Sequence, residues 1–136
     1  MHCPQNKEEL IELIGDENIY LGDIDTSKIT DMSWLFKDSN RIFSGIEKWD
    51  TSSVTNMQGM FCNARSFNHD ISSWDTSKVT DMSHMFEWAI SFNKPLNSWD
   101  TSNVENMKAM FQMARLFDQP LDKWDTSSVK DMSHMF

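Results

Sequence analysis

A repeat of 25 residues constrains the fold of this chain more than any other feature. The tetrapeptide Trp-Asp-Thr-Ser begins at Trp49, Trp74, Trp99 and Trp124, and Ile24 opens an equivalent Ile-Asp-Thr-Ser one step earlier. No insertion or deletion breaks this register from residue 24 to residue 136. A unit of this length cannot bury enough apolar surface to fold alone, so we expect successive units to pack on one another.

Within each unit, fixed apolar positions are separated by variable polar ones. Counting the tryptophan as position one, position six is Ile or Val, position nine is Met and position thirteen is Phe in every copy. This pattern is typical of a shared core with a solvated exterior. The core ladders that it predicts contain Met57, Met82, Met107, Phe61, Phe86 and Phe111.

Two local patterns predict secondary structure in each unit. Apolar or small residues at positions nine, twelve, thirteen and sixteen have the spacing of one helix face, and position eight is always Asp or Asn, which favour a helix N-cap. We therefore expect a short helix after position eight. The segments that lead into the tryptophans, such as Leu96–Trp99, predict one short parallel strand per unit. Together these patterns predict an α/β solenoid.

Residues 1–23 precede the repeats and predict an N-terminal cap. A capping residue, Asn6, precedes an apolar stripe, and Gly15 can end the helix. The segment Leu21–Ile24 resembles the first strand. The repeat region, 24–136, then divides into units 24–48, 49–73, 74–98 and 99–123 and a partial unit, 124–136.

The last residues, Met135 and Phe136, lie on the apolar face of the predicted final helix. An uncapped end of a repeat stack exposes core residues and backbone groups without partners. This predicts either that the chain is a segment of a longer repeat protein or that it associates end to end through the C-terminal coil.

Composition narrows the classes of partner. The formal net charge is −9, which argues against nucleic acid as a partner. No apolar run reaches the ~18 residues of a membrane span, and no secretory signal is recognisable at the N-terminus. Cys3 and Cys62 are too few for a disulfide framework or a cysteine-based zinc site, which leaves two free thiols or one bridge.

One unit reads Val-Thr-Asp-Met-Ser-His-Met-Phe at residues 79–86, Ser-Phe-Asn at 91–93 and Leu-Asn-Ser-Trp-Asp-Thr-Ser at 96–102. This unit resembles the repeat of the BspA-like leucine-rich-repeat surface proteins, and more narrowly their mycoplasma-type branch, a domain of unknown function. The resemblance implies a right-handed leucine-rich-repeat-like solenoid. It also implies a lipoprotein, secreted or surface-attached bacterial protein used in adhesion or host contact, with no catalytic residue and no cofactor.

The aspartate at position two admits two interpretations. Stacked carboxylates could bind calcium, as Asp-bearing nonapeptide repeats do, or each could accept hydrogen bonds from the following turn. The unit lacks the glycine-rich turn of the calcium solenoids, so we favour the structural role and predict no metal site. The ladder consists of Asp25, Asp50, Asp75, Asp100 and Asp125.

Aromatic residues raise a similar choice. The recurrent Trp49, Trp74, Trp99 and Trp124 form either a packed ladder, which we favour, or an exposed strip that grips sugars or peptides. Three other aromatics depart from the repeat and are candidate partner-binding residues, although local packing would explain them equally well. They are Trp34, Phe43 and Trp88.

No set of polar residues converges in the sequence as a catalytic site would require. His84 and His134 share position eleven but lie two units apart, too far to share a zinc ion, and the chain has no phosphate-binding glycine loop. We therefore expect a non-enzymatic repeat scaffold that binds a protein or glycan partner at the cell surface. The alternative is a structural spacer or self-associating segment.

Overall fold

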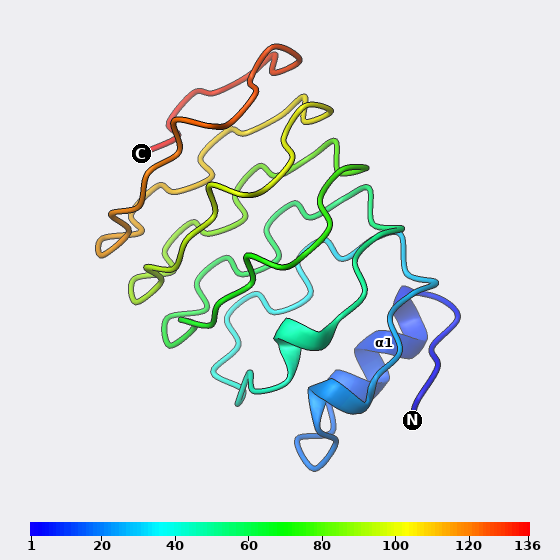
Figure 1. Cartoon of the computed structure of the whole chain (residues 1–136). Coiled ribbons are helices and arrows are strands. Elements are labelled where there is room, and N and C mark those ends of the chain that lie inside the picture. The colour runs from blue at the N-terminus through cyan, green and yellow to red at the C-terminus, as the bar shows by residue number, and fades with distance from the viewer.

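The computed structural model describes residues 1–136 and arranges the repeats as a stack of coils, in which each unit lies beside the next from the N-terminus to the C-terminus (Figure 1). Regular secondary structure is confined to the N-terminal end. There is one α-helix, α1 (Lys7–Ile14), and there are two short 3-10 helices, η1 (Leu21–Asp23) and η2 (Ile46–Lys48). The rest of the stack consists of turns and irregular chain.

The predicted α/β solenoid, with a strand and a helix in each coil, is therefore wrong. The structure has no sheet, and consecutive coils are joined by isolated parallel bridges. In the repeats these bridges occur at position eight, which we had interpreted as a helix N-cap. They pair Asp31 with Asn56, Asn56 with Asp81, Asp81 with Asn106, and Asn106 with Asp131.

A series of alternating turns replaces the predicted helix. Between positions nine and sixteen, backbone N–H groups at odd positions donate to the next coil, as Met82 does to the carbonyl of Asn106 at 2.9 Å and Phe86 to that of Met110 at 2.9 Å. Those at even positions close turns within the coil, as Met85 does to the carbonyl of Met82 at 3.3 Å. Positions eleven and fifteen have positive φ, which a helix cannot contain.

The spacing of the coils explains why no helix forms. The phenylalanines at position thirteen stack across neighbouring coils with ring centroids 5.5 to 5.7 Å apart. An α-helix with its side chains is about 10–12 Å wide, so one helix per coil would not fit at this separation. The apolar spacing of a helix face is thus satisfied by a narrower chain path.

The predicted strands are also turns. The N–H groups of Trp74 and Trp99 donate to the carbonyls of Ile71 at 3.1 Å and Leu96 at 3.0 Å, three residues earlier in the same coil. Because these donors are used locally, they are not available for a ladder between coils. The predicted first strand, near Leu21–Ile24, is the 3-10 helix η1 followed by a single bridge between Ile24 and His2.

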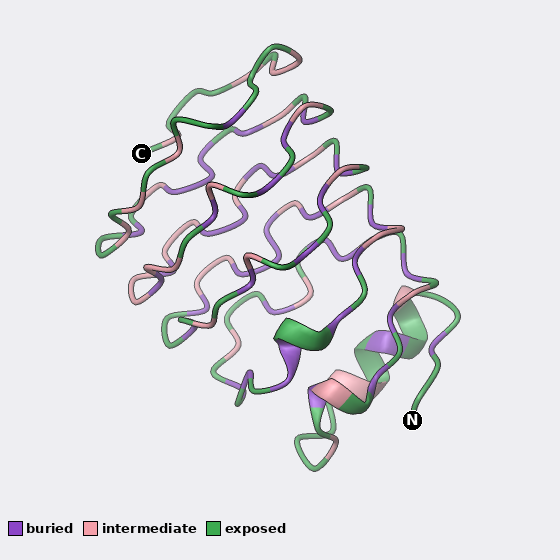
Figure 2. Cartoon of the chain, in the orientation of Figure 1, coloured by how far each residue is buried: buried purple, intermediate pink, exposed green.

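The core runs through the middle of the stack, along equivalent segments of successive coils (Figure 2). Met57, Met82, Phe61 and Phe86 are fully buried, and the phenylalanine rings at positions thirteen and nineteen of one coil also stack, with 4.3 Å between the centroids of Phe86 and Phe92. The core is therefore a pair of aromatic columns with methionine and valine around them.

The four recurrent tryptophans are buried, and each one donates its indole N–H to a carbonyl 28 residues earlier, which lies about one turn of the stack back. Trp49 donates its indole N–H to the carbonyl of Leu21 at 2.8 Å, and Trp74 donates to that of Ile46 at 3.1 Å. The indoles of Trp99 and Trp124 make the same bond. The aromatic ring thus adds apolar contact while its one polar group is satisfied.

Helix α1 covers the N-terminal end of the stack (Figure 1). Asn6 is its N-cap and accepts a hydrogen bond from the N–H of Glu9 at 2.9 Å, and Leu10 is fully buried. The buried Arg41 of the first coil donates to the carbonyl of Ile14 at 2.9 Å, at the end of this helix. It also donates to the carbonyls of Asp16, Ile19 and Ile42. One guanidinium therefore joins the cap to the first coil.

Candidate interaction face

The aspartates at position two lie on the surface, where each one shapes a turn. The carboxylate of Asp75 accepts hydrogen bonds from the N–H of Ser77 at 3.0 Å and from its hydroxyl at 2.6 Å, and Asp100 does the same with Ser102. The backbone contact, to the residue two positions later, recurs at Asp25, Asp50 and Asp125. The structure therefore shows the hydrogen bonds to the following turn that we had favoured for these aspartates.

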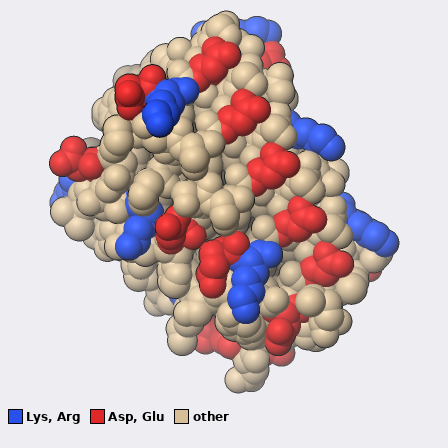
Figure 3. Space-filling view, viewed as in Figure 1, with Lys and Arg blue, Asp and Glu red and all other residues tan.

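These hydrogen bonds hold the pKa of Asp25, Asp75, Asp100 and Asp125 below the usual value of an aspartate. The Ser hydroxyl is the largest cause and the Ser N–H the next. For Asp100, repulsion from its neighbours Asp75 and Asp125 opposes the shift. On the face shown in Figure 3, acidic side chains follow one another in a column along the stack.

Nothing in the structure gathers ligands for a metal ion. No group of three or more His, Cys, Asp or Glu side chains is placed to hold one. Nδ1 of His84 contacts the carboxylate of Glu87, and His134 lies at the same position two coils further on. Both cysteines are free thiols. Burial, and then the nearby Glu87 carboxylate, raise the pKa of Cys62.

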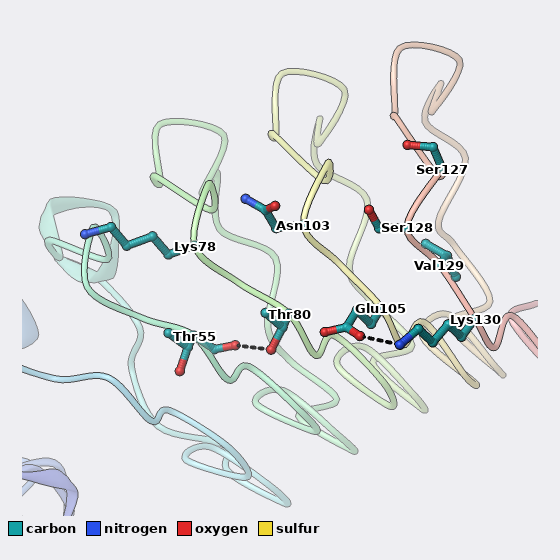
Figure 4. Close-up of a pocket in the computed structure, with 9 residues that line it drawn as sticks. All are labelled: Thr55, Lys78, Thr80, Asn103, Glu105, Ser127, Ser128, Val129 and Lys130. Atoms are coloured by element: carbon teal, nitrogen blue, oxygen red, sulfur yellow. Dashed lines mark hydrogen bonds and ion pairs between the residues drawn. The ribbon is translucent and has the colours of Figure 1, made fainter.

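The largest depression is an open groove of about 710 Å³ that crosses the later coils at positions four to seven (Figure 4). Eight of its nine lining residues are polar or charged. Of its three charged side chains, Lys130 donates to Glu105 at 2.8 Å, and Lys78 has no ion pair. Thr80 turns its hydroxyl toward the carbonyl of Thr55 at 3.3 Å. The groove therefore offers one unpaired charge, that of Lys78, and no convergent set of charged groups.

The alternating turns form a second surface, which we call the turn face and define by positions eleven, fourteen, fifteen and seventeen. Trp34 lies on it, 38% exposed. Its indole ring covers Gly59 in the next coil and reaches His84 in the coil after that, with 5.9 Å between the ring centroids. The ammonium of Lys37 lies 5.6 Å from the Trp34 ring centroid. Trp34 therefore spans three coils.

Trp88 lies half-buried on the turn face between two arginines from the neighbouring coils. The guanidinium carbon of Arg65 is 5.4 Å from the indole centroid and that of Arg115 is 5.6 Å from it. Both distances are within the range of a cation–π contact. Asn63 accepts a hydrogen bond from Nε of Arg65 at 2.7 Å and donates one to Asp38 at 2.7 Å.

Apolar side chains next to this arrangement are exposed. Met113, at position fifteen, directly follows Trp88 in the stack, because the N–H of Trp88 donates to the carbonyl of Gln112 at 2.9 Å. Met113 is 38% exposed, and Leu116, which follows Arg115 in the chain, is 60% exposed. The turn face thus combines aromatic, aliphatic and cationic side chains.

Phe43, the third partner-binding candidate from the sequence, is buried in the core and is therefore not available to a partner. It is 2% exposed and packs edge-on against Phe36 and Phe67, with 5.3 and 4.9 Å between ring centroids. Its neighbour Ile42, which holds the aromatic position of the other coils, is instead 79% exposed. The first coil is therefore shifted by one residue here, and Phe43 fills the core in place of Ile42.

Sequence reasoning missed Arg65 and Arg115. A signal was present, because both occupy position seventeen in the units on either side of the one that contains Trp88. Pairing these arginines with Trp88 would have required knowing that positions fifteen and seventeen of adjacent coils lie on the same surface.

Comparison with known proteins identifies the family of this chain. The model of the family described as "Mycoplasma protein of unknown function, DUF285" matches residues 10–101 and again 30–136. The chain belongs to this family. The two DUF285 matches overlap, as is natural for a chain whose units share one register. The mycoplasma-type repeat of the sequence analysis is thereby confirmed, whereas the wider leucine-rich-repeat assignment is not.

No curated protein and no solved structure matches this DUF285 chain.

No helix of the structure is both long and apolar enough to cross a bilayer.

Proposed function

We propose that the protein is a non-enzymatic binding module whose turn face contacts a protein or glycan partner, as part of a secreted or surface-attached bacterial protein. The observation that carries the proposal is the presence of two tryptophans, the exposed Trp34 and the half-buried Trp88, on one face of the stack of coils. Tryptophan and arginine are the residues most enriched among the energetically dominant contacts of interfaces. Other repeat proteins also bind their partners through an extended, regular surface.

The turn face supports binding rather than catalysis. Trp34 packs against Gly59 and lies near His84, and Trp88 lies between two arginines, so little conformational entropy is lost when a partner covers these rings. A cation lies over each ring, and the imidazole of His84 contacts the carboxylate of Glu87 in the same coil. No cleft beside these residues encloses a small substrate.

The test is a comparison of variants on arrays of peptides and glycans. We expect the W34A/W88A variant to lose binding by at least about tenfold, the effect of removing one dominant interface contact. The matched control is I42A, which removes an exposed apolar side chain outside the turn face. Thermal unfolding of each variant checks that the stack is intact. Equal binding by W34A/W88A and the parent protein would contradict the proposal.

A further inference from the structure

We propose that Arg65, Trp88 and Arg115 anchor the carboxylate side chains of an acidic peptide segment in a partner protein. This inference rests on the proposed binding function and names the class of partner. Its first support is the state of the two arginines. Neither Arg65 nor Arg115 belongs to any of the ion pairs of the structure, although the chain carries a net charge of −9.

The third arginine of the chain, Arg41, has a structural role and gives a comparison for the other two. Arg41 is 8% exposed and donates to four backbone carbonyls. Arg65 and Arg115 are exposed, and both lie against the same indole ring. Their charges are thus held at one place on the surface, and no carboxylate forms an ion pair with either; Asp38 is connected to Arg65 only through Asn63.

The two guanidiniums are also oriented before a partner arrives. Stacking on Trp88 restrains both, and Asn63 further restrains Arg65 through its Nε, which leaves the terminal amino groups of Arg65 free. A planar guanidinium recognises a carboxylate through two parallel hydrogen bonds, and an oriented one loses less entropy on doing so.

The surroundings favour a peptide over a sulfated glycan. Met113 and Leu116 are exposed beside Arg115 and can pack against apolar side chains, which a sulfated sugar chain lacks. The Trp88 ring is covered by cations from both neighbouring coils, which leaves less of its face for stacking of a sugar.

The test is a titration of the isotopically labelled full chain with the capped peptide acetyl-Glu-Leu-Glu-Leu-amide, followed by NMR. We expect the indole N–H of Trp88 and the Nε–H groups of Arg65 and Arg115 to shift. The R65Q/R115Q variant should bind at least about tenfold more weakly, because the charge-assisted hydrogen bonds are lost. The K78Q/K123Q variant removes the same charge elsewhere and should bind like the parent.

Three results would overturn the inference: no shift of these signals with the peptide, equal binding of acetyl-Gln-Leu-Gln-Leu-amide, or tighter binding of a heparin tetrasaccharide at the same signals. The array experiment separates this failure from that of the proposed function. If partners bind in a manner that needs Trp34 and Trp88 but is indifferent to R65Q/R115Q, the turn face remains a binding face and only the acidic-peptide assignment is wrong.

Discussion

A short polar side chain that accepts a hydrogen bond from the N–H two residues later is used twice in every coil. At position two the acceptor is always Asp, whereas at position eight Asp and Asn alternate with almost the same geometry. The Ser33 N–H lies 2.8 Å from Asp31 Oδ1, and the Gln58 N–H lies 2.9 Å from Asn56 Oδ1. A neutral acceptor is therefore sufficient to form this turn. We infer that the turn at position two would also form with a neutral side-chain oxygen in place of the carboxylate.

This separation predicts how stability depends on pH. The pKa values of Asp75 and Asp100 are lowered from 3.8, so the unfolded chain takes up these protons first and stability is lost as the pH falls below about 3.8. In D75N/D100N the amide oxygens keep the turns, and the loss of melting temperature between pH 7 and pH 3 should be smaller. Melting curves at the two pH values measure this.

The control for this prediction is D75A/D100A, which removes the acceptors and should lower the melting temperature at pH 7. If the Asn variant is destabilised at pH 7 as much as the Ala variant, then the negative charge itself maintains the turns.

At the scale of the element, the turn ladder depends on positive φ at positions eleven and fifteen. Gly59 is the one residue at position eleven that adopts this conformation without steric cost, and it also lies directly beneath Trp34. In the equivalent position, Ala109 has φ 55° and His84 has φ 59°. Because side chains of different types share this conformation, the ladder between coils imposes it.

The substitution Gly59→Ala tests this element. The new Cβ would lie 2.0 Å from Cε3 of Trp34, so the indole must move. We expect a loss of about 2–3 kcal/mol in unfolding free energy, from the clash together with left-handed strain. In the W34A background the clash is absent, and the loss should fall to about 1 kcal/mol, the strain alone. Denaturant titrations of the parent protein, G59A, W34A and G59A/W34A give the coupling free energy between the two substitutions.

Additive effects of G59A and W34A would mean that the indole does not rest on Gly59, and would remove one support of the turn face.

At the scale of the whole molecule, each coil holds its neighbours through one set of contacts that repeats in register. The hydroxyl of Thr76 donates to the carbonyl of Asp100 at 3.0 Å, and the indole of Trp99 donates to that of Ile71 at 3.0 Å. The same bonds link the other coils. Because the contacts are equivalent, one interior coil is replaceable by its neighbour.

Deletion of the unit 74–98 should therefore leave a folded protein. Trp99 would take the place of Trp74 and donate to the carbonyl of Ile46, as Trp74 now does. We expect one cooperative unfolding transition with a smaller denaturant dependence, because less surface is exposed on unfolding. Denaturant titration measures both quantities. Deletion of 74–97 breaks the register and should abolish this transition; equal stability of the two deletions would contradict the stacking.

The sequence by itself determined the 25-residue register and the side chains that fill the core, because identical residues at identical positions meet wherever equivalent coils touch. It also marked Trp34 and Trp88 as departures from the repeat. It did not reveal Arg65 and Arg115 as the partners of Trp88, since these residues lie in different coils and meet only after the coils are stacked.

Only the tertiary structure decided the backbone conformation. The apolar spacing at positions nine to sixteen fits a helix face, and Asp or Asn at position eight fits an N-cap, so local pattern alone favoured a helix. Stacked phenylalanines such as Phe61 and Phe86 bring the coils to 5.7 Å between ring centroids, and at this separation the N–H groups at positions nine, eleven, thirteen and fifteen bond to the next coil. An α-helix, about 10–12 Å wide and with its interior N–H groups bonded internally, permits neither.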